Sequence, residues 1–201
     1  MQELPIYFKT KHYLTPTISM YYPMIYGLEN LSIEKLINYE ITTQVYELIS
    51  ELRRPDLITC ITGSYAIKTN ERNVLSLNLT GLGDFHGAHP ITIVKAITID
   101  IETGRVYELQ DLFKTDSNYL EVLSKMVYEQ IQERDIPLLG EFEGVRSDQD
   151  YYIADKGLVI YFQQYEIAPY YVGLPYFLIP IYDLSEVIPE DGLLNRMIMG
   201  L

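Results

Sequence analysis

The sequence predicts an α+β fold, in which two main helices pack on antiparallel sheets and the chain forms two closely packed subdomains. Two segments repeat apolar residues with the spacing of an amphipathic helix, and several others alternate apolar and polar residues as strands do. Hydrophobic residues make up 48% of the 201 residues and charged residues 21%, which is typical of a folded protein. A glycine-rich loop at residues 81–90 divides the expected N-terminal subdomain, residues 1–88, from a C-terminal one, residues 89–201.

The N-terminal subdomain is expected to pair one long helix with a sheet. Residues 31–54 predict the helix, because apolar side chains recur at every third or fourth position and Pro55 prevents continuation. Four strands are predicted, at residues 4–13, 17–26, 57–68 and 73–82. The last two form a hairpin with a polar turn at residues 69–72. Alternation along the final strand predicts one buried face, with Leu75 and Leu77, and one solvated face, with Ser76 and Asn78.

The C-terminal subdomain is expected to hold the second main helix. Residues 117–134 predict this helix from a stripe of aliphatic residues. Four strands are expected, at residues 91–101, 105–109, 158–164 and 177–181. A short last helix is predicted at residues 183–188.

Residues 151–184 are unusually apolar and rich in tyrosine. Eight of the nineteen tyrosines lie between Tyr151 and Tyr182, and the chain has no tryptophan. One interpretation is core packing with satisfied hydroxyl groups. The other is a recognition surface, because tyrosine supplies a large contact area at a low entropy cost. On the second interpretation the candidate binding residues are Tyr165, Glu166, Tyr170, Tyr171 and Tyr176.

Glu166 is the one charged residue between Gly157 and Tyr182. A carboxylate in such surroundings is costly unless it is paired or hydrogen-bonded. We therefore expect a structural carboxylate that accepts hydrogen bonds from tyrosine hydroxyls or backbone N–H groups. The alternative is a catalytic acid or base, although no second carboxylate is placed by the sequence to complete a glycosidase-like pair.

Two further groups of polar residues contain side chains of the types that bind metal ions. Asp84, His86 and His89 lie within six residues, but a zinc site needs three or four converging ligands and the glycines around them favour a turn. The acidic segment at residues 141–150 lacks the glycine and closing glutamate of a calcium-binding loop. We predict no metal, no cofactor and no catalytic residue.

The net charge of −13 is unevenly placed along the chain. Residues 1–100 carry a net charge of −2 and residues 101–201 a net charge of −11. Such a field repels nucleic acid and anionic membranes and attracts basic partners, or it serves solubility alone. The single cysteine, Cys60, excludes an internal disulfide. The sequence shows neither a signal peptide nor an apolar run of membrane-spanning length.

Three phrases together resemble the RsiV-like C-terminal domain family of unknown function, which occurs in a lysozyme-sensing anti-sigma factor. They are GAHP at residues 87–90, TIDIETGRVYELQDLF at residues 98–113 and LVIYFQQYEIAPYYVGLPYFLIP at residues 158–180. Residues 5–85 resemble the PdaC-type N-terminal domain, named for a peptidoglycan deacetylase, in the order of strand, long helix and hairpin.

The resemblance implies a non-catalytic module for extracytoplasmic binding or sensing. Its implied partner is a basic protein such as lysozyme, or a cell-wall component, and its implied location is extracytoplasmic or at the cell surface. A cytoplasmic location follows instead if the protein has no leader. The alternative function is a cell-wall glycan hydrolase, with Glu166 or the loop of His86 and His89 as its site, or a deacetylase-associated domain.

Overall fold

The computed structural model describes residues 6–54, 56–57 and 59–198, and these form two compact α+β units. The first unit ends at Val106 and the second begins at Tyr107. The expected boundary between residues 88 and 89 differs from this division, because β5 (Ile91–Asp100) pairs along its whole length with β4 (Val74–Asp84). The glycine-rich segment is therefore the loop of a hairpin within the first unit.

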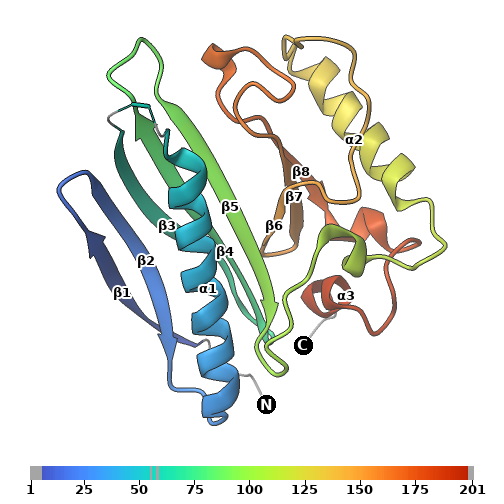
Figure 1. Cartoon of the computed structure of the whole chain (residues 1–201). Coiled ribbons are helices and arrows are strands. Elements are labelled where there is room, and N and C mark those ends of the chain that lie inside the picture. The colour runs from blue at the N-terminus through green and yellow to red at the C-terminus, as the bar shows by residue number, and fades with distance from the viewer. Residues whose placement is uncertain (1–5, 55, 58, 199–201) are drawn as a thin grey trace. The chain divides into compact units, whose positions relative to one another are not determined.

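The first unit is a five-stranded sheet with one long helix (Figure 1). Its strands follow the chain in the order β1 (Tyr7–Leu14), β2 (Ile18–Tyr26), β3 (Cys60–Glu71), β4 and β5. Neighbouring strands are antiparallel except β2 and β3, which are parallel and are joined through α1 (Leu31–Leu52). A parallel pair needs such a crossover connection, so α1 is placed across the sheet.

Helix α1 begins where Asn30 caps it and buries one apolar stripe. The Asn30 side chain accepts hydrogen bonds from the backbone N–H groups of Ser32 and Ile33, at 3.0 and 3.3 Å. The buried residues of the helix are Ile37, Ile41, Val45, Leu48, Ile49 and Leu52. A Cβ atom on Gly81 would lie 2.6 Å from Leu52 Cδ1, so glycine permits this close approach of helix to strand. The helix prediction is confirmed, and Pro55 lies outside the described residues.

The β3–β4 hairpin differs from the prediction in two details. Its turn is tighter than residues 69–72, because Arg72 and Asn73 both adopt positive φ values, 52° and 59°. This conformation matches the twist of a two-residue hairpin. The side chains expected to be solvated, Ser76 and Asn78, are buried. Burial of Ser76 is compatible with its hydroxyl, which lies 3.0 Å from Thr98 Oγ1 and shares a hydrogen bond with it.

The second unit packs a helix against a small antiparallel sheet. The sheet contains β6 (Tyr151–Ala154), β7 (Gly157–Tyr161) and β8 (Tyr176–Pro180), in that order. Helix α2 (Tyr119–Glu133) is attached to β8 by side-chain donors: Gln130 Nε2 lies 2.9 Å from the Leu178 carbonyl oxygen, and the Arg134 guanidinium, just after the helix, lies 2.6 Å from that of Tyr176. The predicted second helix is confirmed.

Short elements of the C-terminal part were predicted less well. No strand forms at residues 105–109; a single bridge joins Ile99 to Val106, and a 3₁₀ helix follows at Leu109–Leu112. The expected helix at residues 183–188 is replaced by a 3₁₀ helix at Ile181–Leu184, and α3 (Leu193–Ile198) comes later. The four-residue strand β6 was not anticipated. Such short segments contain too few residues to show a period.

Candidate functional site

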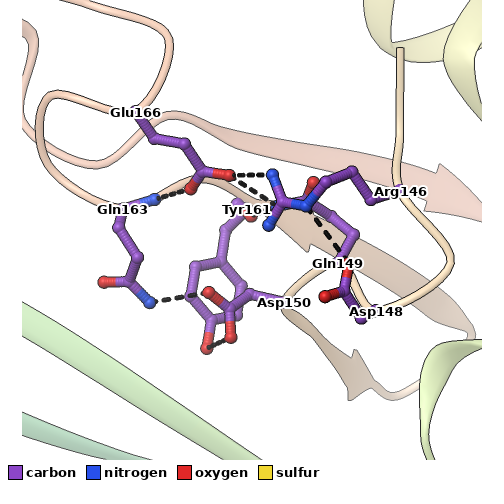
Figure 2. Close-up of polar contacts among 7 residues, drawn as sticks. All are labelled: Arg146, Asp148, Gln149, Asp150, Tyr161, Gln163 and Glu166. Carbon is purple, nitrogen blue, oxygen red and sulfur yellow. Dashed lines mark hydrogen bonds and ion pairs between the residues drawn. The ribbon is translucent and has the colours of Figure 1, made fainter.

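A polar network joins two loops of the second unit and holds the Glu166 carboxylate (Figure 2). Its members come from residues 146–150, before β6, and from the end of β7 and the loop that follows. We call it the Glu166 network; its members are Arg146, Asp148, Gln149, Asp150, Tyr161, Gln163 and Glu166. The two loops meet because the β6–β7 ladder extends beyond the strands, with the Tyr161 N–H donating to the Asp150 carbonyl oxygen at 3.1 Å.

Both oxygens of Glu166 accept hydrogen bonds. Oε1 accepts from Arg146 Nη1 at 2.5 Å and, at the longer distance of 3.4 Å, from Gln149 Nε2. Oε2 accepts from the backbone N–H of Gln163 at 2.6 Å. The hydrogen bond to Glu166 raises the pKa of the Arg146 guanidinium above its ordinary value. Of the donors expected from sequence, a backbone N–H is present, whereas the other partners are Arg146 and Gln149 instead of tyrosine hydroxyls.

The remaining members brace the two loops against each other. Gln149 is buried, and its Nε2 donates to the Tyr161 carbonyl oxygen at 2.9 Å. Asp150 accepts from Gln163 Nε2 at 2.8 Å and from the Tyr161 hydroxyl at 3.4 Å. Sequence reasoning missed Arg146, although a signal existed, because it is the one basic residue in the acidic segment 141–150.

Three of the candidate tyrosines lie on the loop that this network braces. Tyr165 and Tyr171 are exposed, Tyr171 to 78%, and the rings of Tyr165 and Tyr170 lie 5.7 Å apart. The segment is compact: a 3₁₀ turn at Tyr170–Val172 follows Pro169 and ends at Gly173, whose φ of 78° suits glycine. We call residues 163–173 the tyrosine loop. The exposed tyrosines of this loop therefore lie on a backbone that is folded into turns.

Tyr176 belongs to a different aromatic group. It lies on β8, and its ring centroid is 5.7 Å from that of Tyr161 and 6.2 Å from that of Tyr152. Burial raises the pKa of Tyr176, and burial together with the nearby Tyr176 raises that of Tyr152. The ring of Tyr176 therefore contacts Tyr152 and Tyr161, whereas Tyr165 and Tyr170 contact each other.

The raised pKa values of these two hydroxyls predict a loss of stability in alkali. The folded protein holds Tyr152 and Tyr176 neutral, whereas the unfolded chain ionises them near the ordinary value of about 10. Their contribution is thus complete below that pH and is lost as the pH rises through the folded-state pKa values. Denaturant unfolding at a series of alkaline pH values should show this decline, and Tyr152→Phe should flatten it. An unchanged slope in the variant would contradict the assignment.

The residues considered above as metal ligands make local contacts within their own segments. The backbone N–H of His86 donates to Asp84 Oδ1 at 2.8 Å, which closes a local turn with His86 at a φ of 59°. Asp148, in the acidic segment, accepts from Arg146 Nε at 3.1 Å. Over the described residues, no three His, Cys, Asp or Glu side chains are grouped so that they could hold a metal ion. Nor does any helix in that part of the chain have both the length and the apolar character needed to cross a membrane.

Fold and site together define an α+β protein of two units, whose second unit displays tyrosines on a braced loop. Residues 110–182, which include this site, match a family described as "Protein of unknown function (DUF3298)". The chain is also 29% identical over 183 residues to the anti-sigma-V factor RsiV of Bacillus subtilis (strain 168). That match covers 83% of this chain and 63% of the length of RsiV.

Two solved structures share the fold over almost the whole chain. A DUF3298 family member from Bacteroides fragilis NCTC 9343 superposes with a TM-score of 0.67 at 12% identity, covering 98% of this chain and 97% of that one. A DUF3298 family protein from Pseudomonas aeruginosa PAO1 gives a TM-score of 0.64 at 13% identity, covering 99% and 98%. These structural similarities confirm the predicted fold class, and the sequence match to the DUF3298 family extends over residues 110–182.

Proposed function

We propose that this protein is a non-catalytic module for extracytoplasmic binding or sensing, and that it binds a basic protein through its tyrosine loop. A lysozyme-like enzyme is the leading candidate partner, and a cell-envelope ligand is the alternative. The observation that carries the proposal is the exposure of Tyr165 and Tyr171 on a loop fixed by the Glu166 network. In this proposal residues 1–88 are the PdaC-type part of the chain.

An ordered loop of tyrosines suits protein recognition for two physical reasons. Each ring offers a large amphipathic contact area with few rotatable bonds, so little entropy is lost when it is covered. A loop already held in place does not have to be ordered when the partner binds, which leaves more of the contact energy as affinity. The hydrogen bonds of Glu166 to Arg146 and Gln163 provide this order.

Charge favours a basic partner. From residue 107 to the end, the chain contains 6 Lys and Arg against 17 Asp and Glu, a net charge of −11. Attraction between opposite charges raises the rate of association and weakens with salt. The same field opposes binding to nucleic acid.

The similarity to an anti-sigma factor supports a sensing role. A domain that binds a ligand can supply the input of a signalling protein without performing chemistry itself. On this proposal the module lies outside the cytoplasm or at the cell surface, where a cell-wall-degrading enzyme would meet it.

The contacts of Glu166 also support a role without catalysis. Both carboxylate oxygens are engaged by donors from the protein, Arg146 on one side and the Gln163 N–H on the other. A catalytic acid or base must instead reach the proton that it transfers. The other candidate catalytic residues, His86 and His89, belong to the β4–β5 loop of the first unit, whereas Glu166 belongs to the second unit.

The proposal predicts that Tyr171 is a hot spot of the interface, so that Tyr171→Ala weakens binding to C-type lysozyme by about tenfold or more. Calorimetric titration at physiological salt measures the affinity. Tyr39→Ala is the matched control, because it removes a tyrosine of similar exposure, 69% against 78%, from α1 in the first unit. A second basic protein of similar charge tests specificity.

Specific binding must persist at physiological salt and clearly exceed binding to the second basic protein. Weak binding to both proteins that disappears as salt is added would indicate nonspecific attraction and would overturn the proposal. Equal losses in Tyr171→Ala and Tyr39→Ala would remove the tyrosine loop from the interface.

A further inference from the structure

The second unit contains a groove that the tyrosine loop does not form. It has a volume of about 710 Å³ and lies between α2 and the segment at residues 138–144. We call it the α2 groove; its lining includes Glu121, Lys125, Tyr128, Phe142 and Glu143. Its size falls in the range of sites that accept small molecules or single side chains.

The wall opposite α2 is fixed to the helix. The hydroxyl of Ser124, on α2, accepts a hydrogen bond from the backbone N–H of Val145 at 2.8 Å. Gly144 adopts a φ of 103°, and a Cβ atom there would lie 2.9 Å from the same hydroxyl, so only glycine allows this approach. The groove is therefore preformed and needs no rearrangement to open.

Aromatic rings and carboxylates are combined in this groove. The rings of Tyr128 and Phe142 are stacked with centroids 6.3 Å apart, and Tyr128 is about half exposed. The carboxylates of Glu121, Glu141 and Glu143 also line the groove. Among the described residues, none of these three has a hydrogen bond or ion pair to its side chain. The charged side chains that line the groove are thus three carboxylates and one lysine, Lys125, so its net charge is negative.

We propose that the α2 groove receives an arginine or lysine side chain from a basic protein partner. The cationic head would approach the carboxylates, and the aliphatic stem would lie along the rings, where cation–π attraction adds to burial. Charge complementarity selects this occupant over an apolar or acidic one. This inference deepens the proposed function and rests on it for the nature of the partner.

The test uses two short peptides on the whole protein, acetyl-Gly-Arg-Gly-amide and its citrulline analogue. Citrulline keeps the shape of arginine and lacks its charge, so the difference between the peptides isolates the cation. Chemical-shift titration by NMR should place the arginine peptide on amides of α2 and residues 138–144. We expect the citrulline peptide to bind about threefold or more weakly.

Charge variants locate the effect within the second unit. Glu121→Gln combined with Glu143→Gln should remove the preference for arginine. Glu129→Gln combined with Glu133→Gln alters the net charge equally on α2 but outside the groove lining, and should leave the preference intact. Equal binding of the two peptides, or equal losses in both pairs of variants, overturns the inference. The lysozyme titration with Tyr171→Ala tests the proposed function separately, so the two failures are distinguishable.

Discussion

Phe177→Ala is expected to lower the free energy of unfolding by about 3–5 kcal/mol, the range for removing a buried aromatic ring. Phe177 lies on β8 and is fully buried. Its ring packs edge-on against Phe162, with centroids 5.8 Å apart, and the Arg134 guanidinium lies 5.3 Å from its centroid. Truncation would leave a cavity where the small sheet meets the end of α2, and the rigid neighbours could fill it only in part.

The neighbouring Leu178→Ala is the matched control for this prediction. Leu178 follows Phe177 on the same strand, but its side chain points to the other face and is 57% exposed. Its removal should change the free energy of unfolding by less than about 1 kcal/mol. Urea unfolding followed by circular dichroism measures both variants. Similar losses in the two would show that β8 contributes through its backbone and not through a packed core.

Periodicity revealed the long elements of the fold because each depends on its own residues. The stripes of α1 and α2 and the alternation along β4 are local patterns, and both helices end within a few residues of the predicted positions. The role of the segment at residues 81–90 was not evident from the sequence, because a glycine-rich segment is typical of a hairpin loop as well as of a linker. Only the pairing of β4 with β5 decides between the two, and pairing is a long-range property.

The candidate site could be predicted only in part, because the sequence shows local patterns but not long-range contacts. Glu166 is recognisable as the one charge in an apolar stretch, whereas its ion-pair partner Arg146 lies twenty residues earlier, where no local pattern connects the two. Exposure of the tyrosines could not be predicted either, because Tyr161 is fully buried while Tyr171 is the most exposed of the group. Residue type sets what a tyrosine can do, and the packing around it decides which surface it presents.

Glu166→Ala is expected to cost about 1–3 kcal/mol of stability, because the substitution leaves hydrogen-bond donors without their acceptor. The Gln163 N–H and the Arg146 guanidinium lose this partner together. Arg146 is 54% exposed, so water can solvate its freed charge, and Arg146→Ala should cost less, about 0.5–1 kcal/mol. Glu166→Gln keeps a carbonyl acceptor in place and should fall between the wild type and Glu166→Ala.

The double variant separates the ion pair from the backbone contact. If Glu166 acts only through Arg146, the variant lacking both side chains should be no less stable than Arg146→Ala alone. The hydrogen bond to Gln163 predicts that Glu166→Ala remains destabilising when Arg146 is already alanine. Denaturant unfolding of the four proteins gives the coupling energy. If Glu166→Ala leaves the stability unchanged, Glu166 does not brace the two loops. If Glu166→Ala is destabilised and also binds its partner less tightly, the Glu166 network contributes to the order of the tyrosine loop.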